Sequence, residues 1–134
     1  RARGQLELYA VAATQVDLAV RNTRVLARAA RGLIRLGGPA PAPVVDAVRG
    51  LAAAVDALSR RLDEPQRAEE TRDLALEAVA SAASVLDAPD ALALSSVVGQ
   101  VRLTASDLLR ATGFSLAQAQ QALDRAVGLA APDE

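Results

Sequence analysis

Side chains that are mostly apolar recur at alternating intervals of three and four residues through the first part of the chain. The series is Leu6, Tyr9, Ala13, Val16, Val20, Thr23, Ala27, Ala30 and Ile34. This spacing puts every member on one side of an α-helix, as in helices that pack side by side. A β-strand would alternate every second residue, and no stretch does so for long enough to predict one. The pattern predicts a long first helix in an all-α fold.

Glycine, proline and capping residues divide the rest of the chain into four more helices. Gly37 and Gly38, with the prolines that follow, predict an internal loop over residues 37–43. We predict a single domain, residues 1–134, folded as an up-and-down bundle of four main helices with a long first helix and a shorter fifth, C-terminal helix. The second helix is expected over about 44–62, and the third from Pro65, after an acidic cap at Asp63 and Glu64, to a break at residues 87–90. The fourth is expected from a cap at Ser95 or Ser96 to Gly113, and the fifth from a capping box at Ser115 to Gln118 onward.

Each later helix has its own set of residues predicted to face the core. The second has Val44, Val48, Leu51, Val55, Leu58 and Leu62; the third has Thr71, Ala75, Ala78, Ala82 and Val85. The fourth has Val98, Val101, Ala105, Leu108, Leu109 and Thr112; the fifth has Leu116, Ala119, Leu123, Ala126 and Val127. Many of these residues are alanines, which let helices approach closely but bury little apolar surface each.

The composition excludes most kinds of chemistry. The chain has no Cys, His or Met, so disulfides, thiolate or imidazole metal ligands, and Ser–His or Cys–His catalytic pairs are excluded. The acid-rich stretch over residues 63–77 has no His beside it and suits the solvated first turns of a helix better than a metal site. We expect no metal, no cofactor and no enzyme activity.

Charge and aromatic content argue against nucleic acid as a partner. The net charge is −1, and Tyr9 and Phe114 are the only aromatic residues, too few for a base-stacking surface. Every basic residue is Arg, which with the high Ala content is typical of a GC-rich bacterial genome, so arginine content alone is no functional clue. The longest charge-free run, Ala111 to Leu123, is shorter than the roughly 18 apolar residues that a membrane span needs.

Two segments, residues 15–28 and 97–113, place polar side chains among apolar ones. One interpretation is structural, because polar groups between helices fix their register and choice of partner. The other is a small polar pocket between the first and fourth helices, in which Arg21 or Arg102 holds a ligand carboxylate. Asn22 and Gln100 would orient that ligand. The residues proposed for this polar cluster or ligand site are Arg21, Asn22, Arg24, Gln100, Arg102, Asp107 and Arg110.

Five arginines line one edge of the expected first helix, which we call the arginine edge. They are Arg21, Arg24, Arg28, Arg31 and Arg35. The edge is either a solvated face, a set of structural ion pairs, or a surface for an anionic ligand or lipid headgroup. For the ion pairs, Asp17 lies four residues before Arg21, and Asp107 would reach Arg21 or Arg24 from another helix.

The strings VRNTRVLAR, from Val20, and VGQVR with ASDLLRATG, from Val98 and Ala105, resemble the soluble C-terminal part of bacterial fusaric-acid-resistance-like proteins. This family overlaps with the aromatic acid exporters, and the likeness is strongest to actinobacterial members. The resemblance implies a cytosolic helical domain at the bacterial inner membrane, with the membrane-spanning portion of the same polypeptide as its partner. It also implies export of aromatic acids or related small organic anions by that portion. We expect the chain to be a fragment of such a protein.

Two functions of different classes follow. The first is a cytosolic accessory or assembly domain of a membrane exporter, which forms a homo-oligomer and does not catalyse. The alternative is a stand-alone helical bundle for ligand sensing or protein interaction. Six further residues widen the apolar surface of the first helix beyond a single stripe: Leu8, Val11, Leu18, Val25, Leu26 and Leu33. We predict an interface on this surface, at Leu8, Val11 and Leu18.

Overall fold

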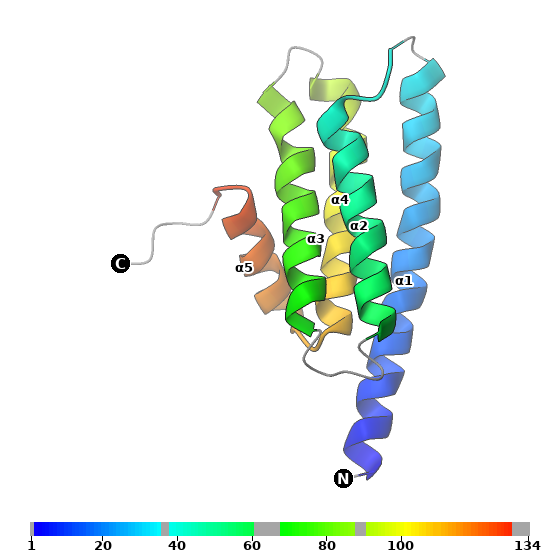
Figure 1. Ribbon diagram of the computed structural model, residues 1–134, viewed down its shortest axis with the longest axis vertical. Helices are drawn as coiled ribbons and strands as arrows, with labels where there is room; N and C mark the ends of the chain where they lie inside the picture. Colours follow the sequence, from blue (N-terminus) through cyan, green and yellow to red (C-terminus); the bar gives the residue numbers. More distant parts are fainter. Residues whose placement is uncertain (1, 36–37, 61–67, 88–90, 130–134) are drawn as a thin grey trace.

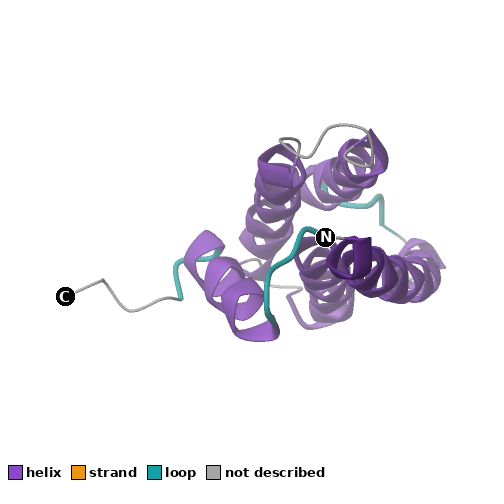
Figure 2. Ribbon diagram, turned by 90° about the horizontal axis from the view of Figure 1, so that it is seen from below, coloured by secondary structure: helices purple, strands orange, loops and turns teal. Residues whose placement is uncertain are grey.

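The computed structural model describes residues 2–35, 38–60, 68–87 and 91–129, and all statements below concern these residues. They form α1 (Ala2–Arg35), α2 (Ala42–Arg60), α3 (Ala68–Ala83), the short 3₁₀ helix η2 (Ser84–Asp87), α4 (Ala91–Ala111) and α5 (Leu116–Ala126). The described residues contain no strand (Figure 2). The four long helices run up and down beside one another, and α5 lies along the side of the bundle, against α3 and α4 (Figure 1). The predicted all-α fold, with a long first helix and a short last one, is confirmed.

Two helices begin earlier than predicted. α2 begins at Ala42, so the predicted loop over 37–43 is shorter at its end. Pro43 fits the first turn because a proline there gives up an N–H that has no helical partner. α4 begins at Ala91 rather than after a cap at Ser95 or Ser96. Ala and Leu are strong helix formers, and the Ser95 hydroxyl donates to the Leu92 carbonyl within the helix instead (2.8 Å).

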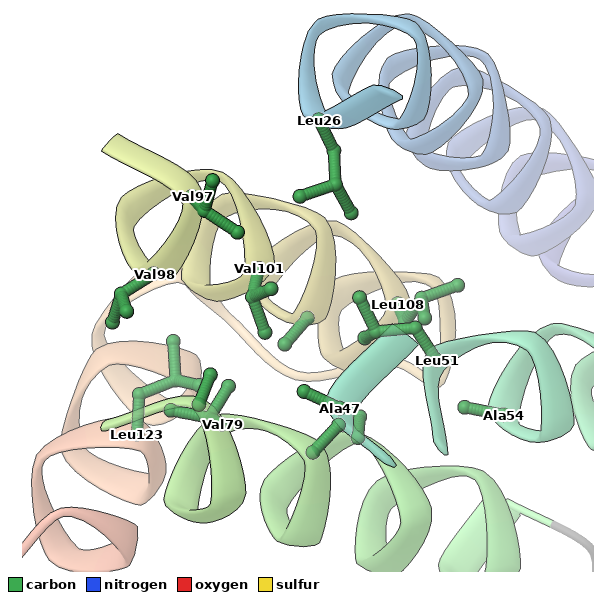
Figure 3. Close-up of a cluster of buried hydrophobic side chains, with 14 of the residues drawn as sticks. Leu26, Ala47, Leu51, Ala54, Val79, Val97, Val98, Val101, Leu108 and Leu123 are labelled. Atoms are coloured by element: carbon green, nitrogen blue, oxygen red, sulfur yellow. The ribbon is translucent and has the colours of Figure 1, made fainter. Parts of the chain in front are cut away.

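The core lies between α2, α3 and α4, and the faces predicted for α3 and α4 are confirmed. All five predicted residues from Thr71 to Val85 are buried, as are all six from Val98 to Thr112. Figure 3 shows Val101 and Leu108 of α4 in one cluster with Leu51 of α2 and Leu26 of α1.

The predicted face of α2 is wrong in part. Val48 and Val55 are exposed, and the small residues beside them face the core instead: Ala47, Ala54 and Ala57. Close packing against α3 explains the choice, since a Cβ added at Gly50 would lie 3.1 Å from the Cβ of Ala78. Larger side chains have no room at such a contact, so the valines point outward.

The junction between α4 and α5 follows its sequence signals. Gly113 has a φ of 103°, a left-handed conformation that closes α4. Ser115 then opens α5 with the predicted capping box, because its hydroxyl accepts from the Gln118 N–H while the Gln118 side chain accepts from the Ser115 N–H. Of the predicted inward face of α5, Ala119 and Leu123 are buried, whereas Leu116 is exposed.

The seam predicted to bury α1 is exposed instead. We call its nine residues, from Leu6 to Ile34, the heptad seam; eight are exposed, and only Ala30 is half-buried. Its large side chains, Leu6, Tyr9, Val16, Val20 and Ile34, are 39–67% exposed. The buried residues of α1 are Gln15, Ala19 and Leu26. The prediction fails because, among the described elements, α4 alone has Cα atoms within 8 Å of those of α1, and α4 contacts a different side of the helix.

Candidate functional site

The contact between α1 and α4 contains a buried polar pair. Asn22 of α1 donates a hydrogen bond from Nδ2 to Oδ2 of Asp107 on α4, at 2.6 Å. Asp107 is 8% exposed and Asn22 is half-buried. Three residues were expected to face the contact between the first and fourth helices, Asn22, Gln100 and Asp107, and of these Asn22 and Asp107 pair there. A short, charge-assisted hydrogen bond between two helices fixes the register of one helix relative to the other.

Burial sets the protonation of the Asp107 carboxyl. Removal from water raises its pKa above the ordinary value, while the hydrogen bond from Asn22 and the positive charge of Arg110 lower it and offset only part of that rise. Arg110 lies three residues along α4 and is half-buried. The carboxylate is therefore partly desolvated, and its partner comes from the opposite helix.

Apart from Arg110, the other residues of the predicted cluster do not join this pair. Arg102 donates from Nη2 to Oδ1 of Asp124 on α5 at 2.6 Å, so it holds α5 against α4. Gln100, seven residues before Asp107, lies on the same side of α4 two turns away. Its side-chain Oε1 is buried and accepts no hydrogen bond from the described residues, as is true of Oε1 of Gln15 on α1.

The predicted ion pairs of the arginine edge are absent from the described residues. Arg21 and Arg24 are exposed, and Asp107 binds Asn22 instead of either of them. Asp17 is also exposed, and within the described residues it forms no ion pair with Arg21. The physical reason is geometric: at 3.6 residues per turn, the arginine edge lies roughly 180° around α1 from Ala19 and Leu26, so it points away from α4.

The arginine edge frames an open hollow on the surface of α1. It is lined by Arg28, Arg31, Gly32 and Arg35, all on α1, and is open to solvent rather than enclosed. Gly32 lacks a side chain, which leaves space between the guanidinium groups around it. This hollow carries positive charge and lies apart from the Asn22–Asp107 pair. The candidate residues therefore do not form the one pocket between α1 and α4 that the sequence suggested.

Sequence reasoning missed an arginine that joins α3 to the end of α4. Arg72 donates from Nε to Oγ1 of Thr112 (2.8 Å) and from Nη2 to the Thr112 carbonyl (2.9 Å). Its guanidinium also lies over the ring of Phe114, 4.1 Å from the centroid. The only sequence signal was the presence of a lone Phe directly after the glycine that ends α4. These contacts satisfy a carbonyl at the helix end and fix the start of the turn into α5.

The N-terminal end of α1 extends past the other helices (Figure 1). We call residues 2–11 the overhang, because every one of them is exposed. Leu8 and Val11, two of the predicted interface residues, lie there, while Leu18, the third, is half-buried. Leu8 precedes Gln15 by seven residues and Asn22 by fourteen, so all three lie on the side of α1 that faces α4. The overhang thus continues the α4-facing stripe beyond the end of α4.

Comparisons with family models, with curated proteins and with solved structures found no match. No helix in the described part of the chain has the length and apolar content required to cross a membrane. Over the same residues, no three acidic side chains gather as a metal site would require. Asp63 and Glu64, part of the acid-rich stretch, lie outside the described residues.

Proposed function

We propose that this chain is a non-catalytic assembly domain, the cytosolic part of a membrane exporter of the fusaric-acid-resistance-like type. The overhang is the observation that carries the proposal. Leu8 and Val11, 63% and 53% exposed, continue the packing stripe of α1 beyond the end of α4. A helix that presents an apolar stripe past its own bundle is built to contact something outside the bundle.

The free energy available at the overhang supports a docking role. Fully burying one Leu or Val side chain is worth about 1.5–3 kcal/mol, so Leu8 and Val11 together leave a few kcal/mol of unused stabilisation in water. The overhang carries only two charged side chains, Arg3 and Glu7, which do not break the apolar stripe. In the proposed exporter, the overhang docks on the membrane-spanning portion of the same polypeptide, on the cytoplasmic side of the inner membrane.

The polar residues of the bundle support an assembly role over a catalytic one. The Asp107 carboxyl is buried and accepts a hydrogen bond from Asn22, and the Arg102 guanidinium donates a hydrogen bond to Asp124. Each of these contacts joins two helices, and none presents a reactive group in a cleft. The class of exported substrate, aromatic acids or related small organic anions, rests on the sequence resemblance alone.

The alternative, a stand-alone ligand-sensing bundle, has one observation in its favour. The hollow at Arg28, Arg31 and Arg35 is open and positively charged, as the binding of an anion requires. The gene separates the two proposals. Apolar segments of roughly 20 residues encoded in the same reading frame upstream support the exporter. A start codon adjacent to Arg1 supports the stand-alone bundle.

A paired substitution tests the docking role in the full-length protein. Leu8→Glu with Val11→Glu is expected to abolish export and to lower the amount of assembled protein in the membrane. The control is Leu103→Glu with Leu116→Glu, at residues 50% and 52% exposed elsewhere on the bundle, which is expected to change neither. Circular dichroism of both variants of the chain checks that the helices form. Equal export by the two variants would rule out a docking role for the overhang.

A further inference from the structure

We propose that the heptad seam of α1 binds the same seam of a second copy of the chain, with the two helices antiparallel. This inference rests on the proposed function, since it names one partner of an assembly domain. The seam repeats at intervals of three and four residues over 29 positions, from Leu6 to Ile34, and its large side chains are exposed. A stripe with this period is the pairing surface of coiled coils.

The seam is available without any change in the bundle. At 3.6 residues per turn, it lies roughly 100° around α1 from Gln15, Ala19 and Leu26, the residues buried against α4. A second helix on the seam therefore leaves the Asn22–Asp107 contact intact. The Thr23 hydroxyl, in the middle of the seam, is already satisfied, because it donates to the Ala19 carbonyl at 2.8 Å. Its burial in a dimer leaves no unpaired donor.

One antiparallel register pairs nearly the whole seam. The seam residues occupy the first and fourth positions of each seven-residue repeat. In an antiparallel pair, each first position of one helix packs against a fourth position of the other. Setting Val20 against Thr23 of the second copy satisfies this rule along the entire overlap, which runs from Tyr9 to Ile34 and spans roughly 39 Å. The other layers then pair Tyr9 with Ile34, Ala13 with Ala30, and Val16 with Ala27 of the second copy. Leu6 alone falls outside the overlap.

Charge decides the direction of the helices. In the antiparallel register, the positions flanking the seam set Asp17 beside Arg24 of the second copy, and the two-fold symmetry makes this contact twice. All five residues of the arginine edge lie in the C-terminal half of α1, whereas the N-terminal half carries Arg3, Glu7 and Asp17 and so has a net charge of −1. A parallel pair would place the two arginine-rich halves side by side. The antiparallel pair places each beside the acidic half of its partner and also opposes the helix dipoles.

Cysteine cross-linking tests both the partner and the direction, because the chain has no Cys of its own. Tyr9→Cys and Ile34→Cys are made as single variants and oxidised alone or mixed at tens of micromolar. Antiparallel pairing predicts a cross-linked dimer only in the mixture, because the two copies of residue 9 lie about 37 Å apart. Cross-linking of each variant alone would overturn the antiparallel direction. No cross-link in any sample, with a monomer mass by light scattering, would overturn self-association.

Charge reversal tests the register. Asp17→Arg and Arg24→Asp are each expected to raise the dimer dissociation constant about five-fold or more, and the double variant is expected to restore it. Arg28→Asp, which lies away from the seam, is the control and is expected to have a smaller effect. A double variant as weak as the singles would overturn this register. Leu8→Glu with Val11→Glu lies off the seam and leaves the cross-link unchanged, so failure of overhang docking and failure of self-association are distinguishable.

Discussion

Replacing Asp107 by alanine removes the acceptor that joins α4 to α1. The Nδ2 group of Asn22 then loses its 2.6 Å hydrogen bond while it remains half-buried at the helix contact. A hydrogen bond to a charged group contributes about 1.5–3 kcal/mol net. Alanine also relieves the cost of burying the carboxylate, which offsets part of that loss. The expected decrease in the free energy of unfolding is about 1–2 kcal/mol.

Urea denaturation measures this change, and a double-mutant cycle assigns it to the pair. Asn22→Ala, Asp107→Ala and the double variant are expected to give a coupling free energy of about 1 kcal/mol. Asp46→Ala is the matched control, because Asp46 is an exposed helical aspartate 3.9 Å from Arg49, and it is expected to cost less than about 0.5 kcal/mol. A coupling free energy within about 0.3 kcal/mol of zero would refute the role of the hydrogen bond.

The raised pKa of Asp107 gives the same pair a pH dependence. The folded chain holds this proton to a higher pH than the unfolded chain does, because burial outweighs the effects of Asn22 and Arg110. The stabilising contribution of the neutral carboxyl is fully present below the ordinary carboxyl pKa and is lost as pH rises through the folded value. Asp107→Asn keeps the shape and stays neutral, so it is expected to be more stable than the wild type at pH 7. The difference is expected to shrink toward zero below pH 4. A difference that is constant with pH would contradict this reasoning.

Two further predictions concern helix packing. Gly99→Ala adds a Cβ with nothing within 4 Å of it, and it is expected to raise the free energy of unfolding, measured by thermal unfolding, by up to about 1 kcal/mol. Gly50→Ala adds a Cβ 3.1 Å from the Cβ of Ala78, so its gain in stability is expected to be clearly smaller. Equal gains would show that α2 and α3 separate easily. Arg72→Ala is expected to lower the unfolding free energy by about 1–3 kcal/mol, through loss of two hydrogen bonds to Thr112 and the contact with Phe114. An unchanged urea midpoint would show that the Arg72 contacts do not contribute to the stability of the fold.

The sequence by itself determined the helices and the inward faces of α3 and α4. Their core positions combine a 3.6-residue period with breakers that have a single structural meaning, such as Gly113 with its left-handed φ and the Ser115 capping box. In α4 the apolar face is also the only continuous one. Local propensity and the core requirement agree there, so the pattern had one solution.

The candidate site could be predicted only in part. Asn22 and Asp107 stood out because polar residues interrupt apolar stripes, and the structure brings them together. The partner of Arg102 could not be predicted, because Asp124 lies on another helix and local spacing carries no information about contacts between distant segments. The same is true of Arg72 and Thr112, which are 40 residues apart.

Only the tertiary structure decided which side of α1 is buried. The heptad seam is the more regular stripe, yet α4 contacts the side that carries Gln15, Ala19 and Leu26. Periodicity fixes that a helix has an apolar side, but burial depends on where a neighbouring helix lies. Among the described elements α4 alone packs against α1, and it does so on the less regular stripe, where Asn22 pairs with Asp107. The heptad seam therefore faces outward. A repeat of apolar residues by itself does not indicate whether its partner helix belongs to the same chain or to another.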